Sequence, residues 1–215
     1  MKRTLDWDKY IEASARAVSG GIVMLKNDGA LPLKKGGTAA VFGRIQLHYY
    51  KSGTGSGGML NVSKVVGITD GLLEAGYTLD EKLMETYREW DEANPFDRGE
   101  GWGGEPWSQK EMPLTDEIVS GAASRADTAV VIIGRTAGEE MDNKIEKGAF
   151  LLSDLEEDML KRVTSAFDKT VVLLNTGGLI DMGFMDRYPV SAVMYVWQGG
   201  MVGGTGTAAV LTGEV

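Results

Sequence analysis

Three short segments of this sequence are almost continuously apolar, and they constrain the fold more than any other feature. They are ADTAVVIIG (126–134), TVVLLN (170–175) and VSAVMYVW (190–197), and a fourth run, TAAVFG, covers 38–43. Parallel strands that are covered on both faces have this composition, whereas strands with one wet face alternate between apolar and polar residues. Because helical patterns separate these runs, the sequence predicts an α/β fold: a three-layer α/β/α sandwich around a mostly parallel sheet.

The helices are predicted from apolar residues spaced three and four positions apart. Ser153 and Glu156 fit a capping box at the start of one helix, and Thr115 opens another. The first helical pattern stops before the turn signal Asn27-Asp28-Gly29. The expected helices lie within 7–27 and over 64–75, 79–93, about 115–125, 153–167 and 202–212. The sequence has no internal repeat and no convincing linker, so we expect residues 1–215 to form one domain.

Composition excludes several classes of protein. The formal net charge of −9 argues against a nucleic-acid partner, because phosphate binding needs a basic face. No run of about 18 apolar residues is present, and no apolar stretch follows the first basic residues, so we expect neither a membrane span nor a signal peptide. Without cysteine, and with a single histidine, disulfides and Cys- or His-rich metal sites are excluded. We therefore expect a cytoplasmic setting with no metal and no cofactor.

Ligands of open α/β sheets gather at the carboxyl ends of the strands, so the loops that leave those ends are the places to search. These loops are 44–63, 134–152, 175–189 and 197–203. A further stretch, 94–113, has no periodicity, and connections of that length are usually functional or mobile. Tryptophans are core or interface anchors by default. Trp102 and Trp107, however, lie in this glycine-rich stretch, where an exposed indole could stack on a sugar or close over a partner domain.

The segment KSGTGSGG (51–58) has four glycines in eight positions. Gly53, Gly55 and Gly58 match the spacing of a dinucleotide-binding fingerprint, but nine residues separate Gly43 from Gly53, and that fingerprint belongs directly between strand and helix. A phosphate-binding P-loop is excluded as well, because no G-K-[ST] occurs. Two interpretations remain: a flexible connection, or a loop over a polar ligand, for which the neighbouring Tyr49, Tyr50 and Lys51 are suited.

The segment GRTAGEEMDNKIEKG (134–148) follows the most apolar strand and is rich in charge. Its acidic residues are Glu139, Glu140, Asp142 and Glu146, and its basic residues are Arg135, Lys144 and Lys147. One interpretation is a solvated loop whose charges neutralise one another. The other is a carboxyl group whose pKa is raised by crowding with its neighbours, as a general acid requires near neutral pH. His48 has no obvious partner in the sequence and is assigned no role.

Several segments together resemble one family. They are LKNDGALPL (25–33), GTGSG (53–57), RTAGEEMD (135–142), the run from LLSDLE (151–156) through VVLLNTGG (171–178), and WQGGMVGGTGTAAVLTGE (197–214). In order and spacing they resemble the α/β sandwich domain of family 3 glycoside hydrolases, the group that contains β-glucosidases and β-xylosidases. The resemblance covers nearly the whole chain.

The resemblance implies a division of chemistry between two domains. In the family a (β/α)8 barrel supplies an aspartate nucleophile, and the sandwich domain supplies the general acid/base glutamate, often in a Ser-Gly-Glu-Gly-Tyr-Asp motif. The matching stretch here is 137–142, which assigns the acid/base role to Glu139. Glu140 replaces a glycine of the motif and Met141 an aromatic residue. Glu140 is therefore a second candidate for the proton, and its charge would tend to raise the pKa of Glu139.

The resemblance also implies a role for the glycine-rich loop, which in the family reaches toward the mouth of the active site. The expected substrate-binding residues are Lys51, Gly53, Thr54, Gly55, Ser56 and Gly57. The implied activity is retaining hydrolysis of terminal β-linked glucose. The implied partners are a carbohydrate substrate and the barrel domain, and the resemblance leaves self-association into a homo-oligomer open. Because this chain contains no barrel, we expect it to be inactive alone and to be a domain that precedes the barrel in a longer protein.

Two other functions remain as alternatives. A non-catalytic binding or interaction module would keep the fold without the chemistry, and the residues Glu140 and Met141 favour that interpretation. A Rossmann-like nucleotide binder would depend on the displaced glycine pattern at 53–58 and is the weaker alternative.

Overall fold

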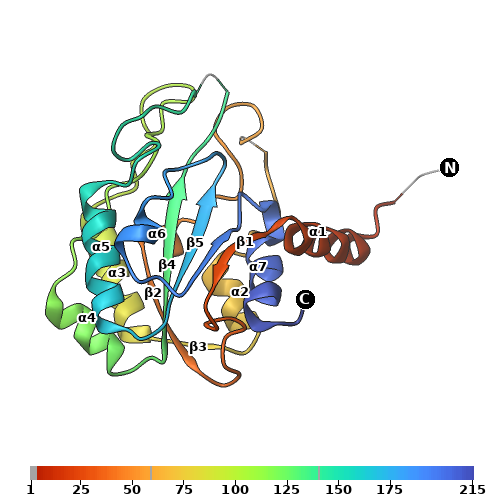
Figure 1. Ribbon diagram of the computed structural model, residues 1–215. Coiled ribbons are helices and arrows are strands. Elements are labelled where there is room, and N and C mark those ends of the chain that lie inside the picture. Colours follow the sequence, from red (N-terminus) through yellow and green to blue (C-terminus); the bar gives the residue numbers. More distant parts are fainter. Residues whose placement is uncertain (1–3, 59, 140) are drawn as a thin grey trace.

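The computed structural model describes residues 4–58, 60–139 and 141–215, and these fold around one sheet (Figure 1). Its strands lie in the order β1-β6-β5-β4-β2-β3. Only β1 runs antiparallel to its neighbour β6, and the remaining pairs are parallel, which confirms the predicted mostly parallel sheet. The strands are β1 (Val23–Asn27), β2 (Thr38–Phe42), β3 (Thr78–Leu79), β4 (Thr128–Arg135), β5 (Thr170–Thr176) and β6 (Ala192–Tyr195).

Helices cover both faces of the sheet, as the three-layer prediction requires. Figure 1 shows α3, α4 and α5 on one side of the sheet and α2 and α7 on the other. The helices are α1 (Trp7–Gly21), α2 (Ile68–Glu74), α3 (Glu81–Ala93), α4 (Asp116–Ala123), α5 (Asp154–Ala166), α6 (Phe184–Arg187) and α7 (Gly203–Thr212). No helix within the described ranges is long and apolar enough to span a bilayer.

The central strand β4 shows why the apolar runs are continuous. All of its residues are buried. Val131 and Ile133 pack into the hydrophobic core shared with α3, α4, α5 and α6, whereas Val130 and Ile132 pack into the core shared with α2 and α7. Successive side chains of a strand point to opposite faces, so a strand between two helical layers needs an apolar residue at every position.

The predicted helix caps are confirmed. Ser153 precedes α5, where its Oγ accepts a hydrogen bond from the amide of Glu156, and Oε2 of Glu156 accepts one from the amide of Ser153 over 2.8 Å. Thr115 caps α4 by accepting from the amide of Ile118. Each cap satisfies donors that the first turn of a helix leaves unpaired.

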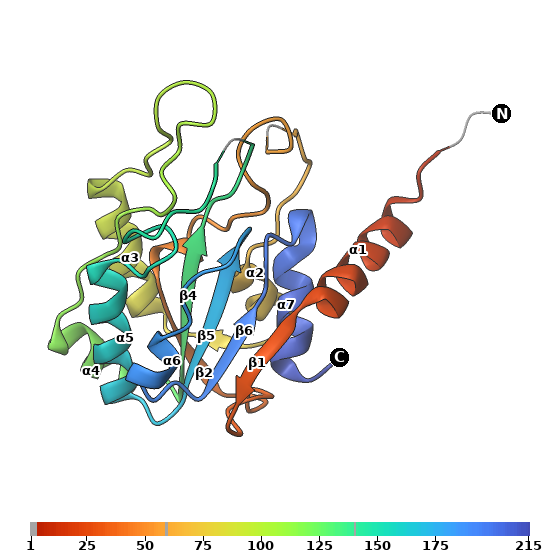
Figure 2. The same ribbon diagram turned by 45° about the horizontal axis from the view of Figure 1, so that its top comes forward.

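The prediction of a single helical segment within 7–27 is wrong at its C-terminal end, over residues 23–27. α1 ends at Gly21, and residues 23–27 form the edge strand β1 instead. Two consecutive glycines, Gly20 and Gly21, weaken the helix at this point, and the indole of Trp197 donates a hydrogen bond to the carbonyl oxygen of Gly21. Pairing with β6 then holds the chain extended. α1 itself has no buried residue and extends away from the sheet beside α7 (Figure 2).

Candidate functional site

Two loops that are far apart in the sequence lie side by side at the carboxyl ends of β2 and β4. Thr54, in loop 44–63, forms a parallel bridge with Gly138, in loop 134–152. The amide of Thr54 donates to the carbonyl oxygen of Ala137 over 2.5 Å. The glycine-rich and acidic segments therefore form one site rather than two.

The glycines allow this close contact. A Cβ atom on Gly53 would lie 2.1 Å from the carbonyl oxygen of Ala137, and one on Gly138 would lie 2.1 Å from Oγ1 of Thr54. A Cβ on Gly58 would lie 1.9 Å from the carbonyl oxygen of Gly53. Such distances exclude any side chain, so the composition of this segment reflects backbone packing as well as turn geometry.

Glu139 is exposed beside this contact. Its Oε2 accepts a hydrogen bond from Oγ of Ser56 over 3.2 Å. A Cβ on Gly55 would lie 3.1 Å from Cβ of Glu139, so the glycine-rich loop also packs against the stem of this side chain. Met141 accepts a weak hydrogen bond at its sulfur from Thr54 Oγ1. Glu140, the second candidate for the proton, lies outside the described residues.

Arg135 lies at the start of the acidic loop, residues 134–152, and fixes its conformation. Its guanidinium forms a bidentate ion pair with Glu156, with Nη1–Oε1 at 2.5 Å and Nη2–Oε2 at 2.7 Å, and both side chains are buried. The same guanidinium donates to the carbonyl oxygens of Ala149 and Leu151. A side chain at the start of the loop that carries Glu139 thus binds the end of the same loop. A bidentate arginine–carboxylate pair is well suited to such a fixed geometry.

Two ion pairs among the described residues connect this loop to α5. Arg135 pairs with Glu156, and Lys147 pairs with Asp154, so two of the three basic residues bind carboxylates of α5. Neither pair involves Glu139.

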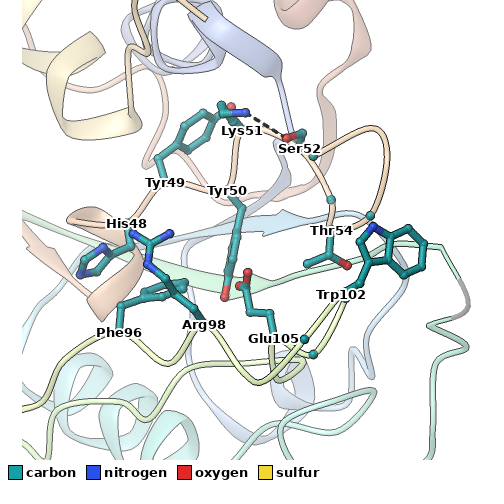
Figure 3. A pocket seen from close by; sticks show the side chains of 16 residues that line it. His48, Tyr49, Tyr50, Lys51, Ser52, Thr54, Phe96, Arg98, Trp102 and Glu105 are labelled. Atoms are coloured by element: carbon teal, nitrogen blue, oxygen red, sulfur yellow. Dashed lines mark hydrogen bonds between the residues drawn. The ribbon is translucent and has the colours of Figure 1, made fainter. Parts of the chain in front are cut away.

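A cavity of about 630 Å³ opens beside the glycine-rich loop (Figure 3). Segment 48–58 lines one side of it, and residues from 96–105 line the other. Asn175, at the end of β5, holds the first wall: its Oδ1 accepts from the amide of Tyr50 over 2.9 Å, and its Nδ2 donates to the carbonyl oxygen of the same residue over 3.0 Å. Asn175 is completely buried, so this wall is fixed to the sheet.

The cavity is lined by both polar and aromatic groups. Figure 3 shows the Tyr50 hydroxyl and the Glu105 carboxyl pointing toward one another. Burial is the main cause that raises the pKa of both groups, and it raises the pKa of Tyr49 to about 12. Trp102, 57% exposed, lies at the rim.

The predicted substrate-binding residues divide into two groups. Lys51, Gly53, Thr54 and Gly55 line this cavity. Ser56 and Gly57 do not line it; both are exposed, and Ser56 contacts Glu139 instead. Trp107 does not line this cavity; with Gly138 it lines a second hollow of about 570 Å³.

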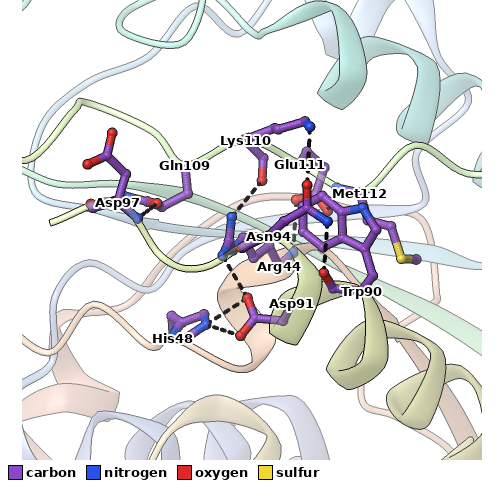
Figure 4. Close-up of polar contacts among 10 residues, drawn as sticks. All are labelled: Arg44, His48, Trp90, Asp91, Asn94, Asp97, Gln109, Lys110, Glu111 and Met112. Atoms are coloured by element: carbon purple, nitrogen blue, oxygen red, sulfur yellow. Dashed lines mark hydrogen bonds and ion pairs between the residues drawn. The ribbon is translucent and has the colours of Figure 1, made fainter. Parts of the chain in front are cut away.

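A buried arginine anchors the start of stretch 94–113 (Figure 4). Arg44 pairs with Asp91 over 2.7 Å and donates through its guanidinium to the carbonyl oxygens of Asn94 and Lys110. His48, for which the sequence suggested no partner, lies 2.8 Å from Oδ2 of Asp91.

The sequence carries no signal for three residues of the cavity's far wall. Phe96, Arg98 and Glu105 line it, but each is an isolated residue in a segment without periodicity. The length of stretch 94–113 indicated a functional or mobile connection, and Trp102 was the lining residue of this wall that the sequence singled out.

The fold and this edge of the sheet define an α/β sandwich domain with a ligand-sized cavity and an exposed carboxylate at the carboxyl ends of its strands. Comparison with known proteins is consistent with that class. Residues 22–215 match the family model described as the glycosyl hydrolase family 3 C-terminal domain. The chain belongs to this family.

Individual relatives agree with the family model. The chain is 59% identical over 211 residues to a β-glucosidase of Ruminococcus albus, covering 98% of this chain and 22% of the relative. Among solved structures, a β-glucosidase from Paenibacillus barengoltzii superposes with a TM-score of 0.93 at 46% identity, over 99% of this chain and 24% of that one. The β-glucosidase 3B of Thermotoga neapolitana, solved in complex with glucose, has a TM-score of 0.87 at 32% identity, over 99% of this chain and 30% of that one. The chain thus spans less than a third of each of these proteins.

Proposed function

We propose that this chain is the acid/base-bearing domain of a retaining β-glycosidase that removes terminal β-linked glucose from oligosaccharides or glucosides. The observation that carries the proposal is the position of Glu139: an exposed carboxylate at the carboxyl end of β4, contacted by Ser56 of the glycine-rich loop. The similarity to β-glucosidases over nearly the whole chain supports the same reaction.

In this proposal Glu139 transfers the proton at both stages of the reaction. It first protonates the glycosidic oxygen as the bond to the leaving group breaks, and it then accepts a proton from the water that releases the sugar. The nucleophile that attacks the anomeric carbon belongs to another domain, the (β/α)8 barrel of the longer protein. A retaining mechanism requires the two carboxyl groups to lie roughly 5–5.5 Å apart when the domains are assembled.

The glycine-rich loop has two tasks in this scheme. Ser56 donates a hydrogen bond to Glu139 and so restricts the carboxylate that must reach the glycosidic oxygen. Lys51 and Thr54 offer donors to the substrate from the wall of the cavity. The placement of this domain ahead of the barrel stays a prediction.

Hydrolysis by the purified 215-residue chain tests the division of chemistry. We expect no turnover of an aryl β-glucoside, because half of the carboxylate pair is supplied elsewhere, whereas the longer protein that contains this chain hydrolyses it. Turnover by the 215-residue chain would show that the nucleophile lies within it. Absence of turnover by the longer protein would instead favour a binding module that keeps the fold.

A further inference from the structure

Trp197, two residues beyond the end of β6, has a left-handed backbone conformation. Its φ angle is +55°, and within the described ranges every other residue with a positive φ is a glycine. This conformation is unfavourable for a bulky residue that carries a Cβ atom. It persists only where the surrounding structure holds it, and such residues cluster at functional sites. The surroundings of Trp197 must therefore supply the interactions that keep it there.

Asn175, near the carboxyl end of the neighbouring strand β5, holds the carbonyl oxygen of Trp197. Its Nδ2 donates to that oxygen over 2.6 Å and to the carbonyl oxygen of Tyr50 over 3.0 Å, and its Oδ1 accepts from the amide of Tyr50. The side chain is completely buried. A carboxylate of the same size has no hydrogen to donate, so this set of bonds requires an amide. Asn175 therefore connects the backbones of loops 44–63 and 197–203 to the end of β5.

The loop that begins at Trp197 contacts the chain that enters the glycine-rich loop. The amide of Gly199 donates to the hydroxyl of Tyr49 over 2.9 Å, and the amide of Gly200 donates to the carbonyl oxygen of Lys51 over 2.8 Å. A Cβ atom on Gly199 would lie 3.0 Å from the same hydroxyl, so the two segments are in close contact. The direction in which the chain leaves Trp197 therefore helps to determine where the glycine-rich loop begins.

The loop that follows β6 also contacts the acidic loop. Nε2 of Gln198 donates to the carbonyl oxygen of Arg135 over 3.2 Å. A Cβ atom on Gly177 would lie 2.4 Å from Cβ of Ala137 and 2.9 Å from Oε1 of Gln198, so these segments pack without room for another side chain. Ala137 lies two residues before Glu139. The loop that Asn175 holds therefore contacts both of the segments that form the candidate site.

We propose that Asn175 is a positioning residue for proton transfer by Glu139. It holds Trp197 in the left-handed conformation and fixes the backbone of Tyr50. The glycine-rich loop is thereby kept against the acidic loop, where the Ser56 hydroxyl reaches Glu139. Asn175 is itself completely buried, so it acts only through these loops. The inference rests on the proposed function, because it assigns Asn175 to the reaction for which Glu139 is the proposed acid.

Backbone amide resonances of the 215-residue chain test the connection between the loops without reference to activity. Asn175→Ala removes all three hydrogen bonds of this side chain, so it should shift the ¹H–¹⁵N resonances of residues 50–56 and 137–139. Val171→Ala is the matched control, because Val171 is completely buried in the same strand, at the end away from these loops. Unchanged resonances in Asn175→Ala, or equal shifts in the two variants, overturn the proposal.

Kinetics of the longer protein test the effect on proton transfer. The leaving group of cellobiose needs a proton, whereas that of a dinitrophenyl β-glucoside departs without one. Asn175→Ala should therefore lower kcat/KM about tenfold or more for cellobiose and at most about threefold for the dinitrophenyl β-glucoside. A loss of folded protein lowers both values equally, as we expect for Val171→Ala. Equal losses with the two substrates in Asn175→Ala overturn the positioning role.

Gln198→Ala tests the same connection with a smaller change to the core and decides the question if Asn175→Ala does not fold. Gln198 is half-buried, and the substitution removes its donor to the carbonyl oxygen of Arg135. The loss of kcat/KM should be about 2- to 10-fold for cellobiose and smaller for the dinitrophenyl β-glucoside. Absence of this selectivity, where Glu139→Gln shows it, refutes the positioning role alone. Native hydrolysis of cellobiose by Glu139→Gln refutes the proposed function instead.

Discussion

The amide of Thr54 donates a hydrogen bond to the carbonyl oxygen of Ala137 over 2.5 Å, and this contact joins segments that lie 83 residues apart in the chain. It brings the glycine-rich loop against the acidic loop, and the Ser56 hydroxyl then reaches Glu139. The glycines around the contact therefore help to determine both the position of Glu139, the proposed acid, and the shape of the cavity wall.

Gly53 and Gly57 provide a matched pair of substitutions for this contact. Gly53→Ala places a methyl group 2.1 Å from the carbonyl oxygen of Ala137, so the two loops must separate, whereas a methyl group on Gly57 meets no atom within 4 Å. In the longer protein we expect Gly53→Ala to lower kcat/KM by about tenfold or more, the consequence of a roughly 1–3 kcal/mol overpacking strain, and Gly57→Ala to leave it unchanged. Similar kinetics for the two variants would show that the contact does not position the site.

The buried pair of Arg135 and Glu156 should contribute strongly to the stability of the fold. Glu156→Gln keeps a side chain that can complete the capping box with Ser153, but it leaves the charge of Arg135 buried without a counter-ion. We expect the free energy of unfolding to fall by about 3–5 kcal/mol, measured by urea denaturation.

An exposed pair provides the control for this substitution. Glu74 pairs with Lys64 at the surface, so Glu74→Gln should leave the unfolding midpoint nearly unchanged. Equal shifts for the two variants would show that burial does not decide the effect.

Glu111 makes stability depend on pH. Complete burial raises its pKa from 4.5 to about 7, even though its carboxylate accepts hydrogen bonds from the amides of Arg44 and Met112. Between these two pKa values the folded state holds a proton that the unfolded state releases. The contribution of Glu111 to the free energy of unfolding is therefore fully present below about pH 4.5 and is lost as the pH rises through 7.

The variant Glu111→Gln isolates that contribution, because its side chain is neutral at every pH. Relative to the variant, the native chain should lose about 3 kcal/mol of unfolding free energy between pH 4.5 and 7. The measurement is urea denaturation of both proteins at several pH values. A difference that is constant with pH, or that changes in the opposite direction, would refute the assignment.

The sequence predicted the layers of the fold because burial on both faces leaves a clear signature. β4 and β5 are apolar at nearly every position, and the Ser153 cap marks its helix without reference to the rest of the chain. The boundary between α1 and β1 was missed because the apolar spacing continues through Gly20 and Gly21 into the strand. Local spacing cannot show that β6 is available to pair with residues 23–27.

The candidate site was predicted only in part, for a similar reason. The glycine-rich and acidic segments each have a visible composition, but no local pattern connects Thr54 to Ala137. Glu105 carries no signal, since a single acidic residue in an irregular segment resembles any solvated one. Its place in the cavity depends on how stretch 94–113 folds over Tyr50.

Replacement of Glu139 in the longer protein is the direct test of its proposed role as general acid. Glu146→Gln is the matched control, because Glu146 is exposed in the same loop and undergoes the same chemical change. We predict that Glu139→Gln lowers kcat for cellobiose by about 10²- to 10⁴-fold, with a smaller loss for a dinitrophenyl β-glucoside, whose leaving group departs without a proton. Glu146→Gln should keep native activity. Native kcat in Glu139→Gln, or an equal loss in both variants, would contradict the assignment of Glu139 as the general acid.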